Sequence, residues 1–89
     1  MKIDYAKSFL KDIKRIKDLK VRARLETTLC SLESADNLED MFGIVAMSGN
    51  SDYFRIRIGQ YRLGLKRATD GRIKVLRFLT RGEIYRYFP

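Results

Sequence analysis

The chain has 89 residues, a net charge of +8 and 45% hydrophobic residues, which predicts one folded domain over 1–89 rather than a disordered basic tail. One cysteine and no histidine exclude a disulfide framework, a Cys/His zinc site and imidazole chemistry, so no cofactor is expected. No apolar run of membrane-spanning length and no signal-peptide pattern is present, which favours a cytoplasmic protein without a membrane partner.

The first part of the chain predicts a short strand and two helices. Alternation over residues 2–5 indicates an opening strand, and apolar residues then recur at helical spacing from Ala6 to Ile16 and from Val21 to Leu32. The short connection around Asp18 predicts an antiparallel helix hairpin with one joint apolar surface. Cys30 lies away from that surface, and we interpret it as an unreactive helix residue.

The middle of the chain carries weaker signals. A polar break predicts a cap at Asp36 or Asn37 for one helical turn that ends at Gly43. We interpret Ile44–Asp52 as a short strand or tether followed by a mobile loop, because an apolar run there gives way to small polar residues.

Three strand signals follow and predict an antiparallel meander. Tyr53–Ile58 alternates with period two, and Gly59-Gln60 is suited to a tight hairpin turn into Tyr61–Ala68. Asp70-Gly71 then predicts a second turn into Ile73–Thr80. The expected fold class is α+β, with the N-terminal helix hairpin packed on one face of a three- to four-stranded, mainly antiparallel sheet.

The positive charge is confined to one segment. From Tyr53 onward there are ten basic residues and two acids, whereas the first 52 residues hold nine of each sign. Alternation places Arg55 and Arg57 on the sheet face away from the core. The next strand adds either Arg62 and Lys66 or Tyr61 and Arg67 to the same face. Planar guanidinium groups that bind phosphates and tyrosine rings that stack on bases are suited to a single-stranded nucleic acid. The alternative is that the charged strand face serves only solubility and prevents edge-to-edge pairing of sheets.

Catalysis by this face would have to use the substrate's own nucleophile. The reaction that fits is cleavage of RNA by attack of its 2′-hydroxyl on the adjacent phosphate, with arginines stabilising the developing charge. Arginine is a poor proton carrier, so the proton-transfer group stays open among Tyr61, Tyr85, Tyr87, Glu83 and Lys66.

Three segments carry a family resemblance that spans essentially the whole chain. The hairpin "YFRIRIGQYRL" at 53–63, the strand "VLRFLTR" at 75–81 and the ending "EIYRYFP" at 83–89 together resemble the RelE/ParE superfamily of type II toxins. The resemblance implies a compact microbial-RNase-like fold and a cognate antitoxin protein in a toxin–antitoxin hetero-oligomer. For the RelE branch it implies an mRNA interferase, a metal-independent endoribonuclease that cuts mRNA in the ribosomal A site and inhibits translation.

The resemblance also implies roles for particular residues. Arg55 and Arg57 match basic residues of the first hairpin strand, Arg62 matches the arginine that stabilises the phosphate, and Arg81 matches the arginine near the leaving 5′-oxygen. The C-terminal tyrosine that stacks on or orients the substrate is matched by Tyr85 or Tyr87. The predicted catalytic set is therefore Arg55, Arg57, Arg62, Arg81, Tyr85 and Tyr87, and the predicted RNA contacts are Lys66, Arg77 and Arg86.

Two positions depart from the family pattern. Arg55 and Arg57 stand where relatives can have lysine, and Thr80 stands where many have histidine. Glu83 is a candidate base, but we rank a helix-stabilising role first. The alternatives are a ParE-like, non-enzymatic inhibitor of DNA gyrase and a plain nucleic-acid-binding module.

Overall fold

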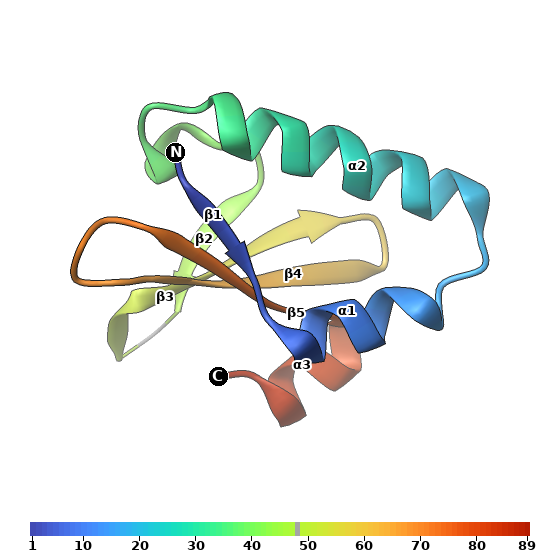
Figure 1. The fold of residues 1–89 in the computed structure, drawn as a ribbon. Helices are drawn as coiled ribbons and strands as arrows, with labels where there is room; N and C mark the ends of the chain where they lie inside the picture. The colour runs from blue at the N-terminus through green and yellow to red at the C-terminus, as the bar shows by residue number, and fades with distance from the viewer. Residues whose placement is uncertain (48) are drawn as a thin grey trace.

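The protein is an α+β domain built on one sheet. A computed structural model describes residues 1–47 and 49–89, and its sheet has five strands in the order β1-β5-β4-β3-β2 (Figure 1). The elements are β1 (Ile3–Tyr5), α1 (Lys7–Lys14), α2 (Leu19–Ser34), the 3-10 turn η1 (Leu38–Asp40), β2 (Ile44–Met47), β3 (Asn50–Ile58), β4 (Tyr61–Arg67), β5 (Ile73–Thr80) and α3 (Arg81–Tyr87).

The predicted class and helix hairpin are confirmed, and the sheet is larger than expected. β1 pairs in parallel with β5, whereas the other neighbouring strands are antiparallel. The two segments with weak strand patterns both form strands. β1 is one edge of the five-stranded sheet, and β2, which follows Gly43, is the other. Within the described residues, no helix is both long enough and apolar enough to cross a membrane.

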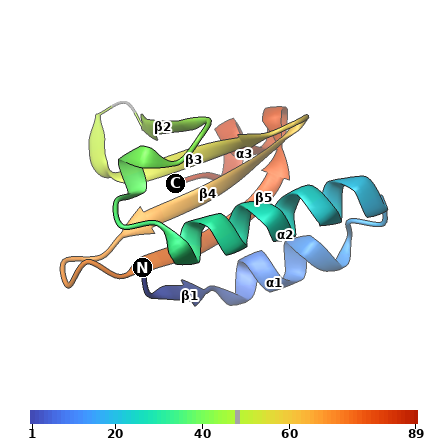
Figure 2. The same cartoon turned by 90° about the horizontal axis from the view of Figure 1, so that it is seen from above.

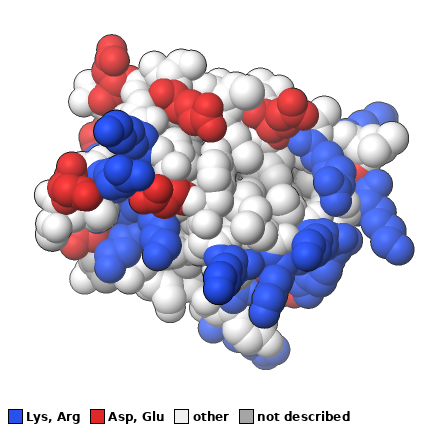
Figure 3. All heavy atoms as spheres, viewed as in Figure 1, with Lys and Arg blue, Asp and Glu red and all other residues white. Residues whose placement is uncertain are grey.

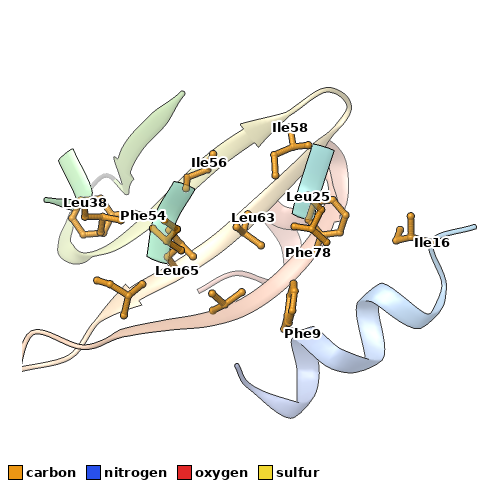
Figure 4. Close-up of a cluster of buried hydrophobic side chains, with 13 residues drawn as sticks. Phe9, Ile16, Leu25, Leu38, Phe54, Ile56, Ile58, Leu63, Leu65 and Phe78 are labelled. Atoms are coloured by element: carbon orange, nitrogen blue, oxygen red, sulfur yellow. The ribbon is translucent and has the colours of Figure 1, made fainter. Parts of the chain in front are cut away.

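α1 and α2 cover one face of the sheet, as their apolar spacing predicts. Asp18 begins α2 by accepting hydrogen bonds from the backbone N–H groups of Lys20, at 2.9 Å, and Val21, at 3.4 Å. Phe9 of α1 and Leu25 of α2 are buried against the strands. Figure 4 shows these side chains meeting those of β3, β4 and β5 in one cluster.

The side chains of α1 also complete the edge of β5 beyond the end of β1. β5 contains a bulge at Leu76, whose carbonyl accepts a hydrogen bond from the Ser8 hydroxyl at 2.6 Å. Asp12 accepts from the backbone N–H of Phe78 at 2.9 Å and from two nitrogens of the Arg77 guanidinium at 2.8 and 3.0 Å. With 3% exposure, Asp12 is a buried carboxylate whose partners replace its water.

α3 covers part of the opposite face of the sheet; the expected architecture did not include it, although the helix-stabilising role ranked first for Glu83 implies a helix here. Figure 2 shows it on the other side of the sheet from α2, where Ile84 and Phe88 pack on Leu79 in a second apolar cluster. Thr80 and Glu83 form a reciprocal capping box at its start. The spacing Thr80-x-x-Glu83 is the sequence signal that predicts this helix. Phe88, which follows the helix, is buried.

Gly64 of β4 lies against the ring of Phe88 near the C-terminus. A Cβ atom at Gly64 would lie 2.7 Å from the ring of Phe88, so we expect Gly64→Ala to displace that ring and lower the free energy of unfolding by about 1–3 kcal/mol. Gly82→Ala in α3 is the matched control, because nothing lies within 4 Å of its Cβ position. Urea unfolding of both variants tests this, and equal stability of the two would contradict it.

The middle of the chain differs in part from expectation. The turn after Asn37 is a 3-10 turn, the Asn37 side chain makes no capping hydrogen bond, and Gly43 takes a positive φ of 78°. The expected short strand is β2, but β3 already begins at Asn50, so the prediction of a loop running to Asp52 is wrong. Ser48, which was assigned to that loop, lies outside the described residues.

Candidate nucleic-acid interface

The register of the β3–β4 hairpin decides which residues share the outer sheet face. Arg57 is directly opposite Arg62, so Arg62 lies on the face of Arg55 and Arg57, and of the two sequence alternatives the one with Arg62 and Lys66 is correct. Tyr61 lies on the helix side, where its ring stacks on Phe78 with 4.9 Å between ring centroids. Tyr61 is therefore a core residue and not a site residue.

Arg62 is held in place by the turn that precedes it. Its Nη1 donates to the backbone carbonyls of Gly59 at 3.0 Å and Tyr61 at 2.8 Å. Burial, and then the neighbouring charges of Arg57 and Arg81, hold the pKa of Arg62 below its ordinary value. Like charges placed opposite each other destabilise a sheet, so the pairing of Arg57 with Arg62 does not itself stabilise the sheet.

α3 completes the site by bringing two further side chains to the same face. The backbone N–H of Arg81 donates to the carbonyl of Gln60 at 2.9 Å, which ties the start of α3 to the β3–β4 turn. The Arg55 guanidinium lies over the ring of Tyr85, with its Cζ 4.8 Å from the ring centroid. We call Arg55, Arg57, Arg62 and Arg81 the arginine cluster.

The arginine cluster differs from three other arginines of the C-terminal segment in having no acidic partner within the described part of the chain. Arg67 pairs with Glu39, Arg72 with Asp4 and Arg77 with Asp12. Among residues 1–47 and 49–89, no ion pair involves a member of the arginine cluster. Four arginines without an acidic partner among the described residues therefore lie together where β3, β4 and α3 meet.

The remaining predicted site residues are distributed over other parts of the surface. Arg77 forms a bidentate pair with the buried Asp12, which gives it a structural role, and its RNA contact stays a prediction. Tyr87 and Arg86 line a hollow with Thr80 and Glu83, away from the side of α3 that carries Tyr85. Lys66 lies on the outer sheet face, with its Nζ 5.4 Å from the ring centroid of Tyr53.

Glu83 has the helix-stabilising role that we ranked first. Its carboxylate accepts from the Thr80 hydroxyl at 2.9 Å and from the Thr80 backbone N–H at 3.2 Å. The side-chain hydrogen bond and then the backbone one hold the pKa of Glu83 below its usual value. Tyr85 is consequently the one candidate proton carrier among those considered that contacts the arginine cluster.

The capping box predicts a specific pH dependence of stability. Because the folded-state pKa of Glu83 is lowered, its ionised form stabilises the fold above the unfolded-state pKa, and this contribution is lost as pH falls through the folded-state value. Thr80→Val removes the partner hydroxyl and should cost about 0.5–2 kcal/mol near neutral pH, as the loss of an N-cap does. Urea unfolding across an acid pH series should show this difference shrinking in acid, whereas a difference independent of pH would contradict it.

The fold and the arginine cluster together define a small α+β domain with a candidate polyanion-binding face. Among the residues that the structure describes, no group of three or more His, Cys, Asp or Glu side chains is placed to hold a metal ion.

The family model described as the ParE toxin of the type II toxin-antitoxin system parDE matches residues 3–85. Toxin RelE3 of Methanocaldococcus jannaschii is 36% identical over 90 residues, covering all of both chains. In the crystal structure of the RelB-RelE antitoxin-toxin complex from Methanococcus jannaschii, one chain is 32% identical with a TM-score of 0.80, covering 97% of this chain and 99% of its own. A chain of the archaeal RelE-RelB complex from Pyrococcus horikoshii, at 23% identity and a TM-score of 0.72, shares the fold and covers 91% of this chain and 94% of its own.

The chain therefore belongs to the RelE/ParE superfamily of type II toxin–antitoxin toxins, as its sequence predicts. It is similar over its full length to a RelE-family toxin, and its fold is RelE-like.

Proposed function

We propose that this toxin is a ribosome-dependent mRNA endoribonuclease whose arginine cluster binds the phosphate at the cleaved bond. The observation that carries the proposal is the arginine cluster itself, four guanidinium groups without acidic partners among the described residues, two of them directly opposite each other. The full-length similarity to Toxin RelE3 supports the RelE branch.

In the proposed reaction, the 2′-hydroxyl of the RNA attacks the adjacent phosphate and expels the 5′-oxygen of the next nucleotide. A cyclic phosphate and a free 5′-hydroxyl result. Arg62, fixed by the turn carbonyls, stabilises the charge on the phosphorane, and Arg81 lies toward the leaving oxygen. Arg55 and Arg57 complete the positive surface around the phosphate.

Tyr85 has two roles in this proposal. Its ring is 60% exposed and is oriented by Arg55, so it is available to stack on a base. Its hydroxyl is also the proposed proton-transfer group, because Tyr85 is the candidate whose side chain contacts the arginine cluster. The ribosome supplies the alignment of the mRNA, which accounts for how a site without histidine can act.

We further propose that a cognate antitoxin neutralises the protein in a toxin–antitoxin hetero-oligomer. The solved relatives from Methanococcus jannaschii and Pyrococcus horikoshii are RelB-RelE complexes. An acidic or amphipathic segment that covers the arginine cluster or displaces α3 would remove the site.

The test is to add purified protein to a translating extract and to map the 5′ ends of the mRNA. Cleavage in phase with codons, absent when ribosomes are removed, is the expected result. Intact mRNA in an extract whose translation is unaffected would overturn the proposal.

The second candidate function is ParE-like inhibition of DNA gyrase, which the match to the ParE toxin model favours. A supercoiling assay with purified gyrase distinguishes the two functions. Inhibition or a trapped DNA cleavage complex, together with intact mRNA in the extract, would favour the ParE-like activity.

A further inference from the structure

A groove of about 640 Å³ separates α2 from β3 on the helix side of the sheet, and Arg57 is the one member of the arginine cluster among its lining residues. It is lined by Arg24 and Thr28 of α2, by Met41 and Phe42 of the segment before β2, and by the end of β3 including Arg57. Figure 3 shows a different face, the one that α1 and β1 occupy, where Lys and Arg gather at the lower right and again at the left around an uncharged centre.

Two guanidinium groups meet the β3–β4 turn from different elements. Arg62 donates to the carbonyl of Gly59 at 3.0 Å. The Arg24 side chain of α2 lies so close to the same glycine that a Cβ there would be 2.8 Å from its Nη1. Arg57 connects them, because it lines the groove with Arg24 and is also directly opposite Arg62.

The positive surface of the arginine cluster therefore continues around the end of the sheet into the groove. No ion pair involves Arg24 among the described residues, and Asp40 is the one acid among the lining residues. A phosphate placed between Arg24 and Arg57 would complete a path of cations that begins at Arg62.

Phe42 supplies the second element of a nucleotide site. Its side chain is 98% exposed, so it is not part of either apolar cluster, although it lines the groove that Arg24 and Arg57 share. Cations that follow the backbone and an aromatic ring open to stacking are the two components of single-strand binding surfaces.

We propose that this groove is a second RNA subsite, in which Arg24 and Arg57 hold a phosphate flanking the cleaved bond and Phe42 stacks on the base of that nucleotide. The inference rests on the proposed RNA-cleaving function and deepens it, because it extends the substrate beyond the two nucleotides at the cut. It commits the groove to a nucleic acid rather than to a protein segment.

The test compares Arg24→Ala and Phe42→Ala with controls of equal charge or character away from the groove, Lys17→Ala and Leu19→Ala. All four side chains are exposed, so the variants are expected to fold, and urea unfolding checks this. Binding of a single-stranded RNA oligonucleotide is measured by fluorescence anisotropy across a salt series. Arg24→Ala should reduce the magnitude of the log–log salt slope by about 0.7 more than Lys17→Ala does, because one phosphate contact is lost.

Phe42→Ala should weaken binding about tenfold with the salt slope unchanged, as the loss of one base stack predicts, whereas Leu19→Ala should leave binding near that of the parent. With a dinucleotide that spans only the cleaved bond, neither groove variant should differ from the parent.

The outcomes separate this inference from the function on which it rests. If the parent protein neither binds RNA nor cleaves mRNA, the proposed function is wrong. If the parent does both and the groove variants match their controls, this inference alone is wrong. Groove variants that bind RNA as the parent does but escape neutralisation by a co-expressed antitoxin would identify the groove as a protein interface and also overturn it.

Discussion

Replacing Asp12 with alanine should lower the free energy of unfolding by about 3–5 kcal/mol, the usual cost of removing one partner of a buried ion pair. The Asp12 side chain has 4% exposure and joins Arg77 and the backbone N–H of Phe78 to α1. Its loss leaves the Arg77 charge and that N–H without their partner. Because domains of this size are stable by only about 5–15 kcal/mol, the variant should unfold at a much lower urea concentration.

Asp4→Ala is the matched control for this prediction. Asp4 also pairs with an arginine through two hydrogen bonds, but in this pair the side chains of Arg72 and Asp4 are 42% and 47% exposed. Solvent screens such a pair, so the urea midpoint of Asp4→Ala should stay close to that of the parent. Similar losses in the two variants would show that burial does not set the strength of these pairs.

Replacing Arg81 with alanine should reduce the rate of mRNA cleavage about 100- to 1000-fold, the usual effect of removing one donor that stabilises transition-state charge. Arg81 is exposed and makes no ion pair with any other described residue, so the fold should be unaffected. Arg62→Ala should have at least as large an effect on the rate. It should also lower stability, because Arg62 holds the carbonyls of the β3–β4 turn.

Arg72→Ala is the control for charge alone. It removes the same positive charge from a residue that pairs with Asp4 away from the arginine cluster. Cleavage is measured by primer extension on mRNA in a translating extract, and growth arrest on expression is the second measurement. Equal rates for Arg81→Ala and Arg72→Ala would remove Arg81 from the site.

Local patterns in the sequence predicted the elements whose side chains have one buried face. Alternation in Tyr53–Ile58 and helical spacing in the two N-terminal helices are both present in the structure. The face on which Arg62 lies could not be predicted, because a slip of one residue in β4 exchanges its two faces. The pairing of Arg57 with Arg62 settles that choice.

The charge pattern predicted the site only in part, because ion pairs connect residues far apart in the sequence. Counted along the chain, the C-terminal segment is strongly basic and the rest is neutral. In the fold, acids of the first part neutralise Arg67, Arg72 and Arg77. The buried position of Asp12 was missed for the same reason, since its partners Arg77 and Phe78 are more than 60 residues away.

The parallel pairing of β1 with β5 has a consequence for the order in which the chain folds. Ile3 is opposite Ile73, so the five-stranded sheet cannot be completed before β5 has been synthesised. Pairing of strands so far apart in the sequence is slow, because a long loop must be ordered first. Arg81 and Tyr85 follow β5 in the chain, so they are synthesised after Arg55 and Arg62. A nascent chain therefore has neither the complete sheet nor the complete arginine cluster until the residues through Arg81 have been synthesised.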